Sequence, residues 1–417
     1  MAFDSWTGGA GNLERLVPAL REKGYDIFLL HIGSWGHDKE RAVEEHIGEL
    51  MVRDICYYDG MSIQDILRRE RPQAVLFLSM QAYAHRAVNR YCKALGIPTV
   101  HLYHGVVGVQ DTSAKRLNPV SVRRQVSLIA SRLTRNVLRV WPLYWRALWN
   151  TGASLQDWVW FVRDVWRQVT ARAYSGPAAP DTATSVCMVY TRADIAHAVE
   201  RYWMTEESVF EVGNPDLMKF GLRQEDLGSC LDANRSPGNE LVYIDNALLE
   251  VGAVFSSSDD FIHHLRCTQD AVAAQGFRFS VKLHPVHYQT GIASEVRAAG
   301  IDVCSDDEFL NKLKRAAGAI VEPSSAALLP CLLGLPVLLA RYGKLSGQNY
   351  GAILMDYPLA RQIYEIEEVK GSLQRIDVCS SIDRKLQDWL INNAGPMPAN
   401  HMPERVADVI QSLTHAQ

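Results

Sequence analysis

Short apolar runs alternate with helix-like patterns along the first part of the chain. The runs 25–33, 74–80 and 98–105 have the length and apolar content of strands. Between the last two, 81–96 carries apolar residues at helical spacing and ends in a glycine, a common residue just after a helix. Strand–helix–strand alternation predicts a parallel sheet that is covered by helices.

A second alternating series follows the polar stretch 223–240, whose composition is typical of an interdomain linker. Its apolar runs are 241–247, 277–285, 300–305, 318–325 and 335–340. We therefore expect an α/β protein with two doubly wound, Rossmann-like domains, 1–222 and 241–417, whose last helix packs back on the first domain. Ligands of such sheets bind beyond the carboxyl ends of the strands, so we expect a central cleft between the two domains.

The first half is interrupted near 112–175 by a segment that we expect to be helical. Its tryptophans are interleaved with arginines. One interpretation is a helical hairpin with the tryptophans in its core. The other is a peripheral membrane contact through 120–172, because indole rings favour the headgroup level and arginine meets lipid phosphate.

Composition narrows the class of protein. Hydrophobic residues make up 47% of the 417 residues and charged residues 22%, as in ordinary globular domains. The net charge of -4 argues against a nucleic-acid partner. We expect neither a signal peptide nor a membrane span. The eight cysteines are scattered without a CxxC pair, which favours a reducing, cytoplasmic location and argues against a zinc site.

Two strand ends in the second half carry candidate chemistry. In "VKLHP" an apolar run ends at His284, where Pro285 stops the hydrogen-bond ladder. Some forty residues later Ser324 and Ser325 open a helix, whose free N–H groups and dipole can hold a phosphate. Parallel strands end at one edge, so His284 could face that phosphate as a cation and protonate a departing oxygen. Without a ligand, the serines would be helix caps and the histidine a loop partner.

Asp245 ends the first strand of the second half, at the same expected edge. It could be a turn or N-cap residue. It could also bond the substrate or attack a sugar carbon, with Lys282 and the helix start at Ser324 shielding the charge of an acidic sugar.

The first half offers weaker candidates. Gly8, Gly9 and Gly11 lie between a strand and a helix and would let the backbone approach a ligand, although they do not form a GxGxxG fingerprint. His104 ends another strand. A structural turn explains each of them equally well. Walker, HExxH, GxSxG and DxD motifs are absent from the sequence, so no metal-bridged diphosphate site is expected.

"KLHP" followed by "EPSS", an amphipathic helix and "LGLPV", in two α/β halves, resembles glycosyltransferases of the GT-B fold. An HP motif before an SS motif is similar to the bacterial sialyltransferases and Kdo transferases, which use CMP-activated acidic sugars. "YIDNALLE" at 243–250 most resembles the retaining β-Kdo transferase branch. The first half lacks the acidic-pair-plus-glycine motif in which sialyltransferases keep their base, and this also favours the Kdo-like branch.

This resemblance implies a site that needs no metal or other cofactor. His284 would contact the CMP phosphate and assist its departure. Ser324 and Ser325 would bind the same phosphate, together with Lys282 and Glu322. Asp245 would be the nucleophile of a retaining reaction that passes through a covalent adduct. The acceptor would be a lipid-linked glycan of O-antigen or capsule assembly, held near Gly8, Gly9, Gly11 and His104.

Two alternatives stay open at this point. The chain could be a GT-B transferase or epimerase that uses an NDP-hexose such as UDP-GlcNAc. It could instead be a noncatalytic, polysaccharide-binding assembly subunit that keeps the fold alone.

Overall fold

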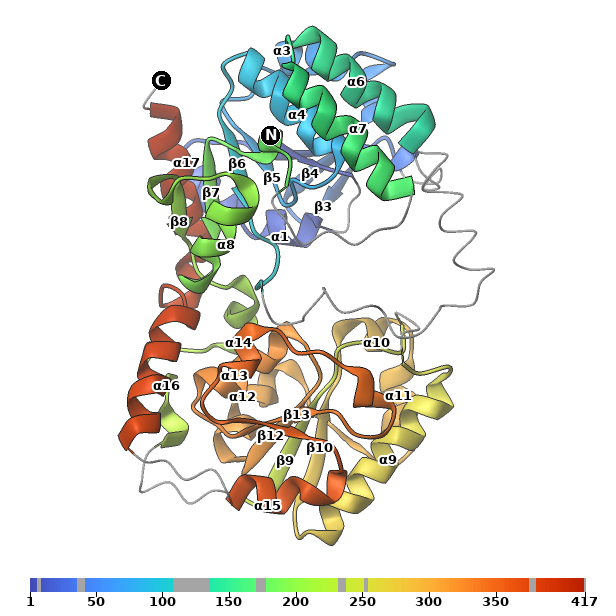
Figure 1. Ribbon diagram of the computed structural model, residues 1–417, viewed down its shortest axis with the longest axis vertical. Helices are drawn as coiled ribbons and strands as arrows, with labels where there is room; N and C mark the ends of the chain where they lie inside the picture. The colour runs from blue at the N-terminus through green and yellow to red at the C-terminus, as the bar shows by residue number, and fades with distance from the viewer. Residues whose placement is uncertain are drawn as a thin grey trace. The chain divides into compact units, whose positions relative to one another are not determined.

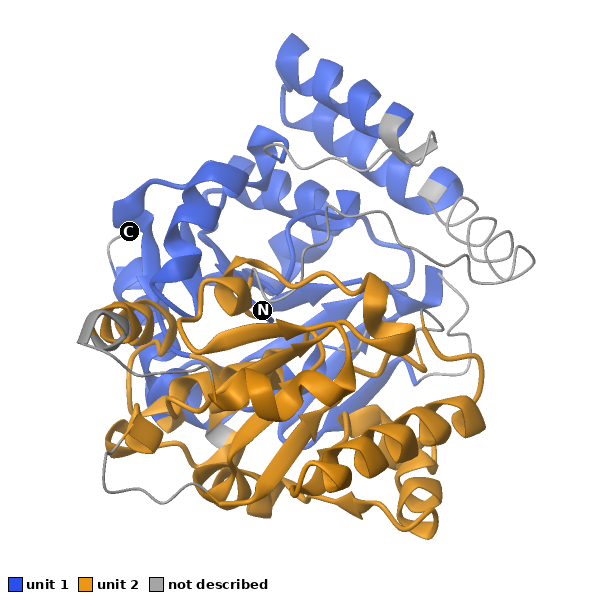
Figure 2. Cartoon of the chain, turned by 60° about the horizontal axis from the view of Figure 1, so that its bottom comes forward, with its two compact units in different colours: residues 1–105, 123–213, 401–417 blue, residues 106–122, 214–400 orange. Residues whose placement is uncertain are grey.

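The computed structural model describes residues 1–5, 9–35, 42–107, 136–169, 178–231, 238–250, 254–374 and 380–415. The chain divides into two compact units (Figure 2): unit 1 holds residues 1–105, 123–213 and 401–417, and unit 2 holds 106–122 and 214–400. Each unit contains its own sheet with flanking helices (Figure 1).

The sheet of unit 1 has the order β3-β4-β2-β1-β5-β6-β7-β8 in the described residues. Every neighbouring pair is parallel except β3 and β4. The strand order reverses between β1 and β5, as in a doubly wound sheet. The strands are β1 (Ala2–Asp4), β2 (Phe28–His31), β3 (Glu44–Ile47), β4 (Leu50–Asp54), β5 (Val75–Phe77), β6 (Thr99–Leu102), β7 (Val186–Val189) and β8 (Val209–Glu211).

Helices connect and cover these strands. They are α1 (Ala10–Glu14), α2 (Val17–Glu22), α3 (Ile63–Glu70), α4 (Tyr83–Ala94), α6 (Trp141–Asn150), α7 (Leu155–Val169), α8 (Ala193–Tyr202) and α17 (Met402–His415). α4 lies between the sheet and the α6–α7 hairpin (Figure 1). α17 packs on α2, where the Tyr25 hydroxyl lies 2.5 Å from Thr414 Oγ1 and Lys23 forms a 2.7 Å salt bridge with Asp408.

The sheet of unit 2 is entirely parallel in the described residues, with the order β11-β10-β9-β12-β13-β14. This is the 3-2-1-4-5-6 order of a Rossmann fold, and it reverses between β9 and β12. The strands are β9 (Glu240–Ile244), β10 (Arg278–Lys282), β11 (Asp302–Val303), β12 (Gly318–Val321), β13 (Val337–Ala340) and β14 (Ala360–Ile363).

Alternate residues of these strands enter two separate cores. Val242 and Ile244 pack with residues of α12 and α13, whereas Leu241 and Tyr243 pack with residues of α9 and α11. Both faces of the sheet are therefore covered. The helices are α9 (Ser258–Ala274), α10 (Pro285–Gln289), α11 (Ile292–Ala298), α12 (Asp306–Arg315), α13 (Leu328–Leu332), α14 (Ala352–Met355), α15 (Val369–Gln374) and α16 (Ser380–Asn393).

The predicted α/β class with two doubly wound sheets is confirmed, and each predicted apolar run contains a strand. The expected helical insertion contains α6 and α7, while 108–135 and 170–177 lie outside the described residues. Unit 2 begins at Asn214, earlier than the expected boundary, and the last helix, α17, packs on unit 1 as expected. Part of the expected linker is tied to unit 2, since the Gly228 N–H donates to the Leu332 carbonyl at 2.8 Å.

Candidate functional site

The carboxyl ends of β9, β10 and β12 meet where the strand order of unit 2 reverses, which is where a doubly wound sheet binds its ligands. A cavity of about 200 Å³ opens at this edge. Five residues predicted from the sequence line it, together with the unpredicted Asp216 and Lys219. The five are Asp245, Lys282, His284, Ser324 and Ser325.

Asp245 is held by donors on both carboxylate oxygens. Its Oδ1 accepts the Ala247 N–H at 3.0 Å, and its Oδ2 accepts the His284 N–H at 2.9 Å. Ala247 has a left-handed backbone (φ 54°), which is costly for a residue with a Cβ. Since the Asp245 side chain has no exposed surface, the carboxylate fixes the loop after β9 and the start of the loop after β10.

His287 is the third partner of this carboxylate, and the sequence analysis missed it. Its Nδ1 lies 3.1 Å from Asp245 Oδ2, and neither side chain is exposed. The imidazole also packs at 5.3 Å from the ring of Phe261. The only signal in the sequence is its position one turn after His284 in "HPVH", which places His287 on α10 and His284 at the N-cap of that helix.

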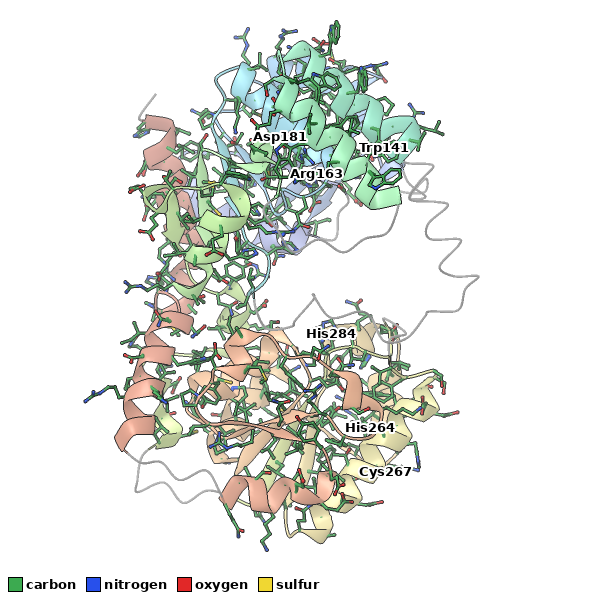
Figure 3. All side chains as sticks on the ribbon, viewed as in Figure 1. Trp141, Arg163, Asp181, His264, Cys267 and His284 are labelled. Carbon is green, nitrogen blue, oxygen red and sulfur yellow. The ribbon has the colours of Figure 1, made fainter. Side chains whose placement is uncertain are left out.

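His284 begins α10 as its N-cap residue (Figure 3). Its Nδ1 accepts the Val286 N–H at 3.3 Å, so the proton of the neutral ring sits on Nε2. Burial lowers the pKa of His284 below its usual value, and the nearby Asp245 charge opposes this shift. Burial therefore favours the neutral imidazole, which can donate a hydrogen bond from Nε2, and the expected cation is a ring that faces a bound phosphate.

The two lysines of the cavity differ in their charge environment. Lys282 is buried and forms a 2.5 Å salt bridge with Asp306, the first residue of α12. Its Nζ also donates to the Leu283 carbonyl at 3.2 Å. Lys219 is exposed on the 3-10 helix Pro215–Phe220, with its Nζ 4.7 Å from the Phe220 ring centre. Lys219 is thus the cation that a ligand can approach.

Ser324 and Ser325 lie where β12 turns into a helix. The helical segment starts as a 3-10 turn, Ser325–Ala327, and continues as α13. Ser324 is its N-cap, and its Oγ accepts the Ala326 N–H at 3.4 Å. The predicted capping role is therefore present. Both serines also line the cavity, so the helix start faces the same space as His284.

Glu322 points into the protein and does not line the cavity. Its Oε1 accepts the Tyr243 hydroxyl at 2.6 Å and its Oε2 accepts the Asn246 N–H at 2.9 Å. Burial, followed by the Asp245 charge, raises the pKa of Glu322 well above its usual value. Its place between β9 and β12 is structural, in contrast to the phosphate-binding place that we expected.

The candidates of unit 1 are only partly brought together, and Gly8 lies outside the described residues. A Cβ on Gly9 would lie 2.5 Å from Leu78 Cδ1 and 3.0 Å from Asp4 Oδ2, whereas nothing lies within 4 Å of one on Gly11. His104 Nδ1 lies 2.6 Å from the Leu78 carbonyl. Close packing at the ends of β1 and β5 therefore explains Gly9, and Gly11 has no such constraint.

Each sheet has an aspartate directly at the end of its first strand, in contact with a buried histidine. In unit 1, His85 Nε2 lies 3.3 Å from Asp4 Oδ1. In unit 2, His287 and Asp245 form the corresponding pair. The histidine comes from α4 in unit 1 and from α10 in unit 2. Each unit therefore has its own carboxylate–imidazole pair at the point where the strand order of its sheet reverses.

Among the described residues, no group of three His, Cys, Asp or Glu side chains is placed to hold a metal ion. The helices of the described ranges are too short or too polar to cross a membrane.

No protein-family model matches the chain, and no curated protein matches its sequence. Several solved structures resemble it. The wall teichoic acid polymerase TagF is 12% identical, with 100% of this chain and 89% of that chain covered and a TM-score of 0.47. The spinosyn forosaminyltransferase SpnP is 12% identical, with 98% of each chain covered and a TM-score of 0.47. MnaA of S. aureus in complex with UDP is 12% identical, with coverages of 100% and 97% and a TM-score of 0.46.

These likenesses assign no activity or substrate to the chain. The strand orders define its class directly: each unit is a doubly wound, Rossmann-like α/β sheet, and unit 2 has a polar cavity where its strand order reverses.

Proposed function

We propose that the chain is a GT-B glycosyltransferase whose second unit binds a nucleotide-activated sugar, with CMP-Kdo as donor and a lipid-linked glycan of surface-polysaccharide assembly as acceptor. The observation that carries this proposal is that His284, Ser324 and Ser325 line one cavity at the switch point of unit 2. A helix start, two hydroxyl groups and an imidazole N–H are donors suited to a phosphate.

In the proposed reaction, the bond between the anomeric carbon and the phosphate oxygen breaks, and its electron pair goes to that oxygen. The Nε2–H of His284 is the donor to the departing oxygen. A bound phosphate would raise the pKa of His284 by supplying a negative charge, so a larger fraction of the imidazole is protonated and able to donate once the donor is bound. The acceptor hydroxyl oxygen forms the new bond to the anomeric carbon, its proton passes to bulk water, and CMP leaves.

Asp245 has a positioning role in this proposal. An attack on the sugar would require its carboxylate to leave the N–H groups of Ala247 and His284, and the side chain has no exposed surface. Intact-protein mass spectrometry with donor and no acceptor separates the two roles. An added sugar that is lost in Asp245→Asn would establish a retaining reaction through a covalent adduct, and no added mass supports positioning.

Titration calorimetry tests the donor. We expect CMP to bind the protein more tightly than UDP, and Ser324→Ala with Ser325→Ala to weaken CMP binding. His284→Ala should lower turnover by about 10²–10⁴. The exposed His263 provides the matched control His263→Ala, which should behave as wild type. Absence of nucleotide binding by the folded protein would refute the proposal.

The NDP-hexose alternative is favoured by one observation. Lys219 is an exposed cation on the rim of the same cavity, suited to the second phosphate of a diphosphate. Tighter binding of UDP than of CMP, lost in Lys219→Gln, would select a transferase or epimerase that uses a sugar such as UDP-GlcNAc. Binding of glycan without any nucleotide would select the noncatalytic assembly subunit.

A further inference from the structure

Half of the exposed large hydrophobic side chains in the described part of the chain, eight of sixteen, fall between Val137 and Trp166. Six of them form what we call the Trp face of the α6–α7 hairpin. It consists of Trp145, Trp149, Leu155, Val159, Val162 and Trp166. The exposure is high: Trp149 is 75% exposed, Leu155 81% and Trp166 64%.

The polarity of α7 is the reverse of that of an ordinary surface helix. Leu155, Val159, Val162 and Trp166 follow one another at spacings of four, three and four residues, so they share one side of the helix. The carboxylates of the helix lie about 200° away from this side and point toward the body of unit 1.

Two salt bridges with α4 fix this orientation. Asp157 lies 3.1 Å from Arg90, and Asp164 lies 2.9 Å from Arg86. Arg86 is buried, and its guanidinium also contacts Asp181 at 2.8 Å. Figure 3 shows Arg163 of α7 and Asp181 in this region. Because the charged side of α7 is anchored to α4, the helix holds its apolar side in solvent.

A groove of about 610 Å³ runs along the hairpin. Its lining is apolar apart from Arg146, and Trp141, Trp145, Phe161 and Trp166 form much of its wall. Monomeric proteins rarely expose large contiguous apolar patches, and those that do mostly use them for binding. The hairpin therefore presents an exposed apolar surface.

The charge around this surface identifies the chemistry of its partner. Residues 112–150 contain eight lysines and arginines and no acidic residue, although the whole chain has a net charge of -4. Arg139 and Arg146 are exposed beside the Trp face and form no salt bridge with any side chain that the structure describes. A partner that complements this surface has an apolar interior for the Trp face and a negatively charged outer layer for the arginines.

We propose that the Trp face docks on an anionic lipid bilayer. The indoles of Trp149 and Trp166 lie at headgroup level, the aliphatic side chains of α7 enter the boundary of the acyl chains, and Arg139 and Arg146 meet the lipid phosphates. Docking is interfacial, since neither helix spans a membrane. The inference depends on the hairpin alone, so it stands or falls separately from the proposed donor.

Vesicle flotation of the full chain tests this inference. We expect binding to equal parts of phosphatidylcholine and phosphatidylglycerol, weak binding to phosphatidylcholine alone, and partial release by salt. Trp149→Ser with Trp166→Ser should lower the partition coefficient on the order of tenfold or more. The matched control is Tyr364→Ser with Ile391→Ser, two residues of unit 2 that are 57% and 64% exposed.

The charge contribution has its own pair of variants. Arg139→Gln with Arg146→Gln should weaken binding by about fivefold for each arginine. The exposed Arg68 and Arg223 supply the control double variant, which should leave binding unchanged. Circular dichroism verifies that each variant is folded.

Three results would overturn the inference. The first is that the folded wild-type protein does not bind anionic vesicles at low salt. The second is that the Trp149/Trp166 double variant floats with the vesicles to the same extent as wild type. A concentration-dependent dimer that the same variant abolishes would show that a second copy covers the face instead.

Discussion

Replacing Asp245 with asparagine tests whether this carboxylate holds the candidate site together. An asparagine that keeps its oxygen toward the Ala247 N–H must turn its NH₂ group toward the His284 N–H, 2.9 Å from the present Oδ2. One charge-assisted hydrogen bond, worth about 1.5–3 kcal/mol, is then lost. A buried N–H without an acceptor costs about 1–3 kcal/mol more. We therefore expect unit 2 to lose roughly 3–5 kcal/mol of stability.

Hydrogen exchange followed by mass spectrometry measures this loss within unit 2, because peptides from β9 and β12 report the opening of that sheet alone. Peptides from β1 and β5 are the internal reference and should not change. Asp302→Asn is the matched control, since Asp302 forms an exposed salt bridge with Lys312 that should contribute less than about 1 kcal/mol.

Exchange in β9 that changes by no more than in the Asp302 control would refute the positioning role. Asp245→Asn should also change the pKa of His284, because the substitution removes a nearby negative charge. In wild type the Asp245 charge opposes the lowering of the His284 pKa, so its removal should lower that pKa further.

Three further predictions follow from the geometry. Gly9→Ala should destabilise unit 1 by roughly 1–3 kcal/mol in denaturant unfolding, because the added Cβ would overlap the Leu78 side chain. Gly11→Ala is the control and should be neutral or stabilising, because nothing lies within 4 Å of its Cβ. Equal effects of the two substitutions would contradict this account of Gly9. Burial lowers the pKa of His264 to about 4, so the neutral ring is the folded form and stability should fall by up to about 3 kcal/mol as pH decreases from 6.5 to 4. His264→Gln should flatten that slope, and an unchanged slope would show that His264 does not cause it. Nucleotide binding should be accompanied by uptake of a proton at His284 near neutral pH. In calorimetry the binding enthalpy should therefore depend on the ionisation enthalpy of the buffer, and His284→Ala should abolish this dependence. Equal binding enthalpies in all buffers would show that the pKa of His284 does not change on binding.

Much of the fold could be predicted because buried parallel strands are continuous apolar runs. β9 and β13 have this pattern and were found from it. The edge strands β3 and β14 were not found. "EEHI" and "ARQI" alternate only weakly, since one side of an edge strand has no neighbour and its side chains need not be apolar. Position in the sheet is not decisive, because the edge strand β11 lies in the predicted run 300–305 and the inner strand β4 lies in no predicted run.

The site was predictable to the extent that chain direction determines it. Parallel strands end at one edge, and this alone placed Asp245, His284 and Ser324 together. Orientation was not predictable. Glu322 and Ser324 are two residues apart, yet one points into the core and the other into the cavity. The local sequence signals His287 only through its position one turn after His284, because the carboxylate that it contacts is distant in the sequence.

The place of α17 in unit 1 has a consequence for the biosynthesis of the chain. Residues 214–400 are translated between the rest of unit 1 and this helix, which at about 5–20 residues per second takes on the order of 10–40 s. During that interval the surface of α2 that α17 covers stays open, and Met402, Val406 and Ile410 have not yet been buried. All residues of unit 2, 106–122 and 214–400, are translated before α17, so unit 2 can mature on the ribosome before unit 1 is complete. We accordingly expect chaperones to bind nascent chains mainly at the N-terminal half of the polypeptide, which is synthesised first.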